Sequence, residues 1–207
     1  RWPWAIDAAL AERGRAVFGS HCASCHGTYG PGGTYPERMV ALDEIGTDRV
    51  RFDSLTQKER SDLNGSWFGH HGRDAERLRN REPPTGYVAP PLDGVWATAP
   101  YLHNGSVPTL WGLLQPAAQR PKAFYRGNDL YDPQHLGFVA DQPVSQGRRL
   151  FAYDTRIPGN HNAGHEGTAY GTTLPDATSA AIASTSSPTA AAVSRATCSS
   201  ASLRPWS

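Results

Sequence analysis

Two of the three cysteines in this 207-residue chain stand three positions apart, and a histidine follows the second. Cys22, Cys25 and His26 form the pattern C-x-x-C-H, the attachment signature of haem c. Two thiols on one turn of chain can each add to a vinyl group of the same porphyrin, and the adjacent histidine can then reach the iron. The motif predicts one covalent haem c, with His26 as an axial ligand.

A cysteine pair at this spacing also serves thioredoxin-like redox chemistry, in which a strand precedes the motif and a helix follows it. Here the order differs. The amphipathic stretch 5–20 precedes the motif, and a loop rich in glycine and proline, 27–36, follows it. The flanking sequence therefore favours haem attachment over a dithiol–disulfide pair.

A haem iron that only transfers electrons needs a second axial ligand from elsewhere in the chain. The segment 159–167, GNHNAGHEG, is rich in glycine, so its backbone can approach a porphyrin closely. We expect His165 to be this ligand, with His161 and then Met39 as alternatives. A ligand histidine usually has its other ring nitrogen held by a carbonyl or a carboxylate, and we expect such a partner near His165.

Composition narrows the class of protein. The formal net charge is +1, and no run of Lys and Arg forms the basic patch of a nucleic-acid-binding protein. The longest apolar runs are far below the roughly 18 residues that would span a membrane. No membrane span is therefore seen in the sequence. With 21 Gly and 17 Pro, the chain is loop-rich. A large bound cofactor would help to organise the core of such a domain.

Local patterns predict few long elements. The apolar spacing in 5–20 predicts a helix directly before the haem motif. A second helix is expected over 54–64, where Thr56 and Glu59 can form a capping box. The stretch 115–160 is expected to contain loops and short strands, because turn-forming residues interrupt it throughout.

The segment APPLDGVWATAPYLHNGSVPTL (89–110) lies between CASCHGTYGPGG and GNHNAGHEGTAYGTTL. Together these segments resemble the C-terminal haem domain of the bacterial di-haem cytochrome c peroxidase superfamily, and most of all its rubber oxygenase-like branch. The resemblance implies a mainly α, class I cytochrome c-like haem domain with long Gly/Pro-rich loop insertions. It also implies that His103 lines the haem crevice.

Three further side chains are candidates for the haem pocket. Trp96 and Tyr101 are expected in haem-pocket and core packing, because aromatic side chains bury large areas wherever they lie. Arg126 has a guanidinium fork that matches a haem propionate, although a solvated arginine is an equal alternative.

We expect the haem domain to occupy residues 1–176. The remainder, 177–207, consists mostly of Ala, Ser and Thr and has no apolar stripe. Its composition predicts a disordered tail. A second hypothesis is a shift of the reading frame in the gene, which would have replaced a terminal helix with this sequence.

Two functions fit the motif and the resemblance. The first is an electron-transfer cytochrome domain that is part of a di-haem protein. The alternative is the haem-containing half of a di-haem peroxidase or rubber oxygenase-like dioxygenase, so the sequence does not decide whether the chain belongs to an enzyme. The expected partner is a redox protein or a second haem domain. Because haem c is attached outside the cytoplasm, we expect a periplasmic or secreted location.

Overall fold

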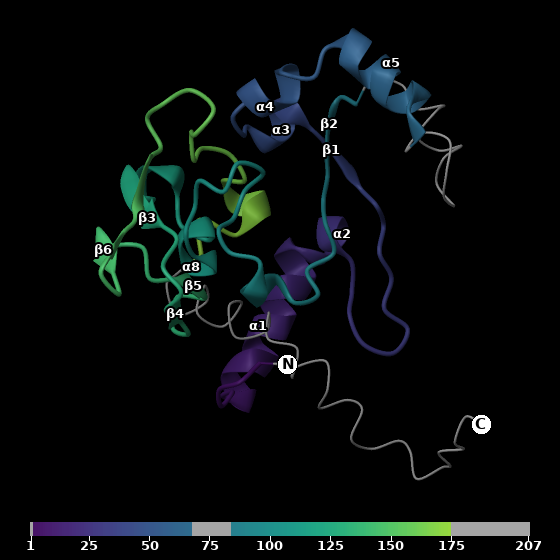
Figure 1. The fold of residues 1–207 in the computed structure, drawn as a ribbon. Helices are drawn as coiled ribbons and strands as arrows, with labels where there is room; N and C mark the ends of the chain where they lie inside the picture. Colours follow the sequence, from purple (N-terminus) through teal and green to yellow (C-terminus); the bar gives the residue numbers. More distant parts are fainter. Residues whose placement is uncertain (1, 68–83, 175–207) are drawn as a thin grey trace, which may run out of the picture.

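A computed structural model describes residues 2–67 and 84–174 as short helices and short paired strands joined by long loops (Figure 1). The helices are α1 (Ala8–His21), α2 (Ala23–His26), α3 (Leu42–Ile45), α4 (Val50–Asp53), α5 (Gln57–Gly65), α8 (Leu110–Leu113) and the 3₁₀ turns η1 (Val95–Ala97), η2 (Ala117–Gln119) and η3 (Thr168–Tyr170). The strands are β1 (Met39–Ala41), β2 (Gly86–Val88), β3 (Ala123–Arg126), β4 (Tyr131–Asp132), β5 (Gly137–Phe138), β6 (Val144–Ser145), β7 (Arg148–Arg149) and β8 (Phe151–Asp154).

Helix α1 is the longest described helix, and it begins three residues later than the sequence predicts. Asp7 is extended, and its carboxylate accepts a hydrogen bond from the backbone N–H of Leu10 at 2.9 Å. This N-cap satisfies one of the free donors at the start of the helix. The buried side of α1 includes Ala11 and Gly14, and the helix contacts η3. The last segment described is thereby brought next to the haem motif.

Helix α5 begins with the capping box that its sequence predicts. The Thr56 side chain accepts from the Glu59 backbone, and the Glu59 carboxylate accepts from the Thr56 backbone. The predicted capping box is confirmed, and the helix begins at Gln57, inside the predicted span 54–64.

The strands form four antiparallel pairs within the described residues: β1 with β2, β3 with β8, β4 with β5, and β6 with β7. In the first, Val40 lies opposite Tyr87; in the second, Phe124 lies opposite Tyr153. The expectation of a mainly α domain is therefore wrong, because the structure is mixed and only partly helical. The frequent Gly and Pro residues limit most described helices to one turn.

The hydrophobic core lies around an N-terminal tryptophan. Buried side chains form one cluster: Trp2, Val95, Tyr101, Val107, Leu110 and Leu136. Trp2 makes edge-on contacts with Trp96 at 5.4 Å and with Tyr131 at 6.2 Å between ring centroids. This core fixes the segment 95–110, which continues into the centre of the molecule.

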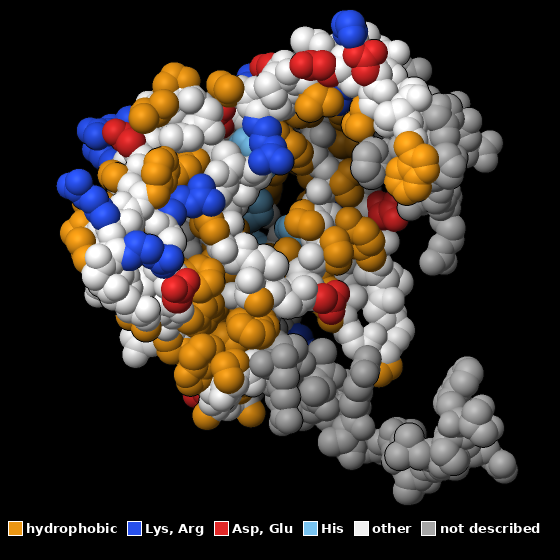
Figure 2. All heavy atoms as spheres, viewed as in Figure 1, with side chains coloured by type: hydrophobic (Ala, Val, Ile, Leu, Met, Phe, Trp, Pro, Cys, Tyr) orange, Lys and Arg blue, Asp and Glu red, His pale blue; other side chains and the backbone are white. Residues whose placement is uncertain are grey.

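The face shown in Figure 2 is hollowed at its centre, and histidine side chains lie in the hollow. In the view of Figure 1, α3, α4 and the β1–β2 pair stand on one side of this space, and β3 and α8 stand on the other. The hollow is thus bordered by segments that are far apart in the sequence.

The predicted tail, 177–207, lies outside the described residues, so the proposed boundary at 176 stays a prediction. In the portion of the chain that the structure describes, no helix has the length and apolarity to cross a membrane.

Candidate haem site

His26 ends the one-turn helix α2, directly after the two cysteines. Its Nδ1 donates to the backbone carbonyl of Pro90 at 2.8 Å. A carbonyl only accepts, so this contact places the imidazole proton on Nδ1 and leaves the Nε2 lone pair free. Burial lowers the pKa of His26, against the opposing effect of the Pro90 hydrogen bond. The ring is therefore neutral near pH 7, which is the form that binds metal.

Cys22 lies between α1 and α2, Cys25 lies within α2, and neither forms a disulfide. Burial, with a smaller contribution from Cys25, raises the pKa of Cys22 to about 11. Cys22 is thus protonated near neutral pH. The two side chains and the His26 ring come from five consecutive residues, as covalent attachment of one porphyrin requires.

A tyrosine fixes the motif to the segment beyond Pro90. The Tyr29 hydroxyl donates to the carbonyl of His26 at 2.9 Å and accepts from the backbone N–H of Leu92 at 2.7 Å. The Phe18 ring meets the Tyr29 ring edge-on at 5.8 Å. The orientation of His26 therefore depends on both its own helix and the 90–92 segment.

His165 faces His26 from the opposite end of the described chain. Their ring centroids are 6.3 Å apart and their planes differ by 52°. Burial first, then the nearby charges of His26 and Arg120, lower the pKa of His165 to about 4. Two neutral imidazoles therefore lie close together with no hydrogen bond between them.

The spacing of these rings can be compared with that of two ligands on one metal. An imidazole nitrogen lies about 1.1 Å from its ring centroid and binds a metal at about 2 Å, so two opposed ligands place their centroids about 6 Å apart. The observed 6.3 Å matches this value. Together with the adjacent cysteines, the histidine pair fits a haem held from both faces.

His165 lies in the glycine-rich segment 159–167, here called the His165 loop. Its backbone is unusual: His165 has φ +49° and Gly164 has φ +84°. The His165 N–H donates to the carbonyl of Ile45 at 2.7 Å. A Cβ on Gly164 would lie 2.5 Å from the backbone of Gly46 and of Thr47. Glycine is required there because two backbones meet directly.

A buried arginine organises the end of this loop. Arg120 is only 3% exposed, and its five N–H donors are matched by five backbone carbonyls: Gln115, Leu113, Asn162, Gly164 and His165, at 2.5 to 3.3 Å. Three of these carbonyls belong to the His165 loop. Arg120 therefore holds the backbone of the candidate ligand itself.

Two polar side chains hold the beginning of the same loop. The buried Asp48 carboxylate accepts from the backbone N–H groups of Gly159 at 2.9 Å and His161 at 3.3 Å. The Asn104 amide donates to the carbonyls of the same two residues at 3.1 and 2.9 Å. Both ends of the loop are thus anchored by residues from other segments.

The alternative ligands lie in different surroundings. The ring nitrogens of His161 face acceptors, Nδ1 at 3.1 Å from the Asp48 carboxylate and Nε2 at 3.2 Å from the Arg156 carbonyl. Both ring nitrogens of His161 are thus close to oxygen acceptors of the protein itself. Met39 lies on β1 with 42% of its surface exposed. Of the three candidate ligands, His165 is the one whose side chain faces the His26 ring within the described residues.

The partner expected for the other ring nitrogen of His165 is not found. Nδ1 of His165 is buried without a hydrogen-bond partner in the described part of the chain. The neighbouring Glu166 carboxylate instead accepts from the backbone N–H of Ala117 at 2.9 Å. Glu166 therefore fixes the loop against η2 and does not orient the imidazole.

The remaining predicted pocket residues divide into two groups. Trp96 and Tyr101 lie in or against the core cluster around Trp2, and burial raises the pKa of Tyr101. His103 stacks on Tyr87, with ring centroids 5.1 Å apart. Arg126 lies over the ring of Tyr153 at 5.1 Å, next to the turn that follows His103.

Sequence reasoning missed Arg120 and Asp48. Each stands in an ordinary polar stretch, QPAAQRP and GTDRV, with no motif around it. Their roles depend on contacts with a loop that is more than forty positions away for Arg120 and more than a hundred for Asp48. Asn104 and Gly105 form a strong turn signal in the sequence, and in the structure the Asn104 side-chain amide oxygen accepts from the Ser106 N–H at 3.3 Å.

One region of the chain matches a known protein family. Residues 86–125 match the family model described as RoxA-like, cytochrome c-like. This span includes Pro90, His103 and Arg120, whereas the cysteine motif and His165 lie outside it. The chain therefore contains a region similar to the RoxA-like cytochrome c-like domain.

Two relatives from Sinorhizobium fredii (strain NBRC 101917 / NGR234) cover more of the chain. The uncharacterized protein y4iJ is 33% identical over an alignment of 218 residues that covers 80% of this chain and 36% of the relative. The uncharacterized protein y4iM is 35% identical over an alignment of 191 residues that covers 80% of this chain and 43% of the relative. The chain thus spans less than half the length of either relative.

Proposed function

We propose that this chain is a c-type cytochrome domain that holds one covalent haem and serves electron transfer. Cys22 and Cys25 provide the two thioether links, and His26 and His165 provide the two axial nitrogens. The observation that carries the proposal is the 6.3 Å separation of the two imidazole rings. It brings a residue from the described C-terminal segment to the haem-attachment motif, with the spacing of opposed ligands.

The protein's own groups prepare this site in two ways. Pro90 fixes the His26 tautomer that leaves Nε2 free. Arg120, Asp48 and Asn104 fix the His165 loop. A bound haem supplies one-electron exchange at its iron, and the potential is set by the axial ligands, burial and hydrogen bonding. Ligands held this firmly change little on oxidation, which suits electron transfer.

The His165 position favours electron transfer over the alternative, a peroxidase or oxygenase half. Those reactions need an open iron coordination position for oxygen or peroxide. Here a neutral, buried imidazole stands opposite His26. Because both relatives are more than twice as long as the part that matches this chain, we propose that the domain works with a second haem domain or a redox partner. Haem attachment would place it in the periplasm or outside the cell.

The first test is covalent attachment. The full chain, produced together with a haem c maturation system, should stain for haem on a denaturing gel and gain the mass of one haem. Replacing both thiols, Cys22→Ala with Cys25→Ala, should abolish the stain. The Cys198→Ala variant is the matched control and should stain like the parent. A double variant that keeps the full stain would contradict the proposal.

The second test is the axial ligand. The parent should show a low-spin ferric spectrum, because two imidazoles give a strong ligand field. His165→Ala should convert the iron to high spin and admit cyanide or carbon monoxide. His161→Ala should stay low-spin, since its ring nitrogens face Asp48 and Arg156. The reverse pattern would assign the iron to His161. A parent with the weak far-red band of thioether ligation would assign it to Met39.

A further inference from the structure

Three buried polar atoms on two stacked side chains have no hydrogen-bond partner among the described residues. They are the two ring nitrogens of His103 and the hydroxyl oxygen of Tyr87. A buried polar atom left unpaired costs about 1–3 kcal/mol, so such atoms in a folded protein require an explanation. The rings stack at 5.1 Å with an interplanar angle of 24°, so a single group can meet both.

The stack is held rigidly by its surroundings. Phe52 meets the Tyr87 ring edge-on at 5.6 Å. Arg51 donates to the backbone carbonyl of His103 at 3.0 Å. The nearby Asp48 carboxylate is occupied by the His165 loop. The unpaired atoms therefore belong to side chains that are fixed in place.

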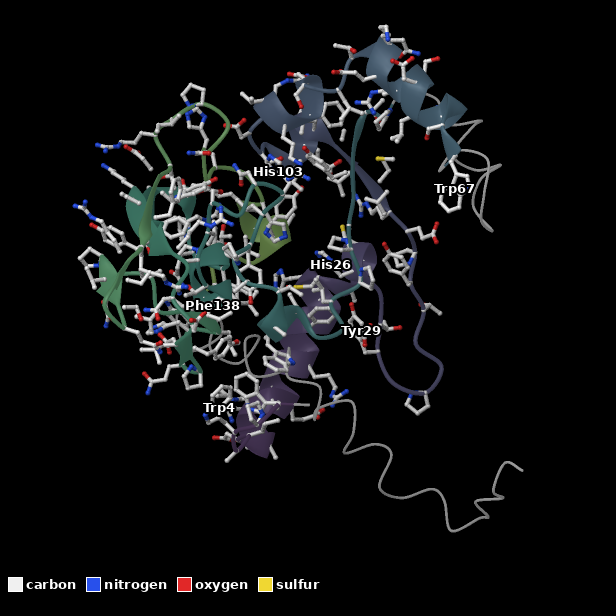
Figure 3. All side chains as sticks on the ribbon, in the orientation of Figure 1. Trp4, His26, Tyr29, Trp67, His103 and Phe138 are labelled. Carbon is white, nitrogen blue, oxygen red and sulfur yellow. The ribbon has the colours of Figure 1, made fainter. Side chains whose placement is uncertain are left out.

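The position of the stack suits one particular part of a haem. Figure 3 shows His103 across the central space from His26, which directly follows the cysteine pair. The thioether links occupy the vinyl-bearing edge of the porphyrin, whereas its two carboxylates extend from the other edge. A porphyrin edge opposite the cysteine motif thus brings carboxylates to the side of the hollow on which His103 lies.

We propose that the Tyr87 hydroxyl and the His103 imidazole N–H donate hydrogen bonds to one propionate carboxylate of the haem. This inference rests on the proposed function, because it requires the haem to be bound. A carboxylate accepts several hydrogen bonds, so one oxygen pair can accept from the Tyr87 hydroxyl and from the protonated ring nitrogen of His103, while the second ring nitrogen, itself an acceptor, is not paired by this contact. The Arg51 side chain adds a positive charge beside the stack, and the carboxylates of Asp48 and Asp53 lie near Tyr87 as well.

The experiment compares the haem-loaded full chain with Tyr87→Phe and with His103→Phe. Both substitutions keep an aromatic ring in the stack and remove only the polar atoms. The propionate bending band in the resonance Raman spectrum reports hydrogen bonding to the carboxylate directly. We expect this band to shift in both variants. The midpoint potential should also fall, because a carboxylate with fewer donors stabilises ferric iron.

Two variants serve as controls. Tyr131→Phe removes a hydroxyl that donates to the Trp96 carbonyl in the core. His135→Phe removes a ring that pairs with Asp132 at 2.6 Å. Neither should move the propionate band. If the band is unchanged in both Tyr87→Phe and His103→Phe while the haem stain and low-spin spectrum persist, water satisfies these atoms and the inference is overturned. A parent chain without covalent haem would instead overturn the proposed function.

Discussion

The two histidines of the candidate site are positioned by different means. His26 depends on its own helix turn, on one hydrogen bond to Pro90 and on the neighbouring Tyr29. His165 has no regular element around it. Its loop is held by Arg120, by Asp48 and Asn104 at its beginning, and by the backbone of 45–47.

One half of the site is therefore locally encoded, because a single short segment contains it. The other half is assembled, because segments far apart in the sequence must meet to form it. The C-x-x-C-H spacing brings three functional groups together within one short segment, whatever the rest of the chain does. The His165 loop needs contacts from three distant segments before its imidazole faces His26. Substitutions in those segments should therefore remove the second ligand and leave covalent attachment of the haem intact.

The largest effect is expected from Arg120→Met. The substitution leaves buried carbonyls of the His165 loop unpaired, at about 1–3 kcal/mol for each lost partner. We expect the free energy of unfolding to fall by about 4 kcal/mol and the ferric iron to become high-spin. Urea unfolding followed by circular dichroism, together with the visible spectrum, measures both. The haem stain should persist.

Arg148→Met is the matched control for this variant. Arg148 also bonds a backbone carbonyl, that of Gly127 at 2.7 Å, but 62% of its side chain is exposed. Exposed pairs contribute about 1 kcal/mol or less, so little should change. Equal losses in the two variants would show that Arg120 is not a positioning residue for His165.

A smaller effect is expected where the His165 loop meets the 45–47 backbone. Gly164→Ala would place a methyl group 2.5 Å from Gly46 and Thr47 at φ +84°, so we expect a loss of about 3 kcal/mol. Gly94→Ala has φ +72° but no atom within 4 Å of its Cβ. Its loss should be about 1–2 kcal/mol, from strain alone. Thermal unfolding of both variants separates close approach from strain, and equal losses would refute the distinction.

The locally encoded features are those that sequence reasoning could predict. The capping box at Thr56 and Glu59 is confirmed, and the helix before the motif is present at Ala8–His21, against the predicted span 5–20. The short strands expected over 115–160 are confirmed as β3 to β8, whereas the expectation of a mainly α domain is wrong because these strand pairs make the structure mixed. The structural role of Arg120 could not be predicted, since it depends on hydrogen bonds to five backbone carbonyls from other parts of the chain.

The smallest expected effect depends on pH and tests the anchor at the beginning of the loop. Burial of Asp48 acts to raise its pKa, but hydrogen bonds from Val50, Gly159 and His161 and the charge of His161 lower it overall. A carboxyl whose folded pKa lies below its ordinary value of about 3.9 stabilises the fold above that pH. The contribution is lost as pH falls through the folded pKa.

Asp48→Asn should therefore lower the free energy of unfolding by about 1–2 kcal/mol near pH 7. Below about pH 4 the difference from the parent should shrink, because protonation then removes the same charge in the parent. Urea titrations across this range measure the change. Asp43→Asn is the control, because its carboxylate is 93% exposed and pairs only with Arg49 among its described salt-bridge partners. If the Asp48→Asn difference stays constant to about pH 3, then packing anchors the beginning of the His165 loop and the Asp48 charge does not.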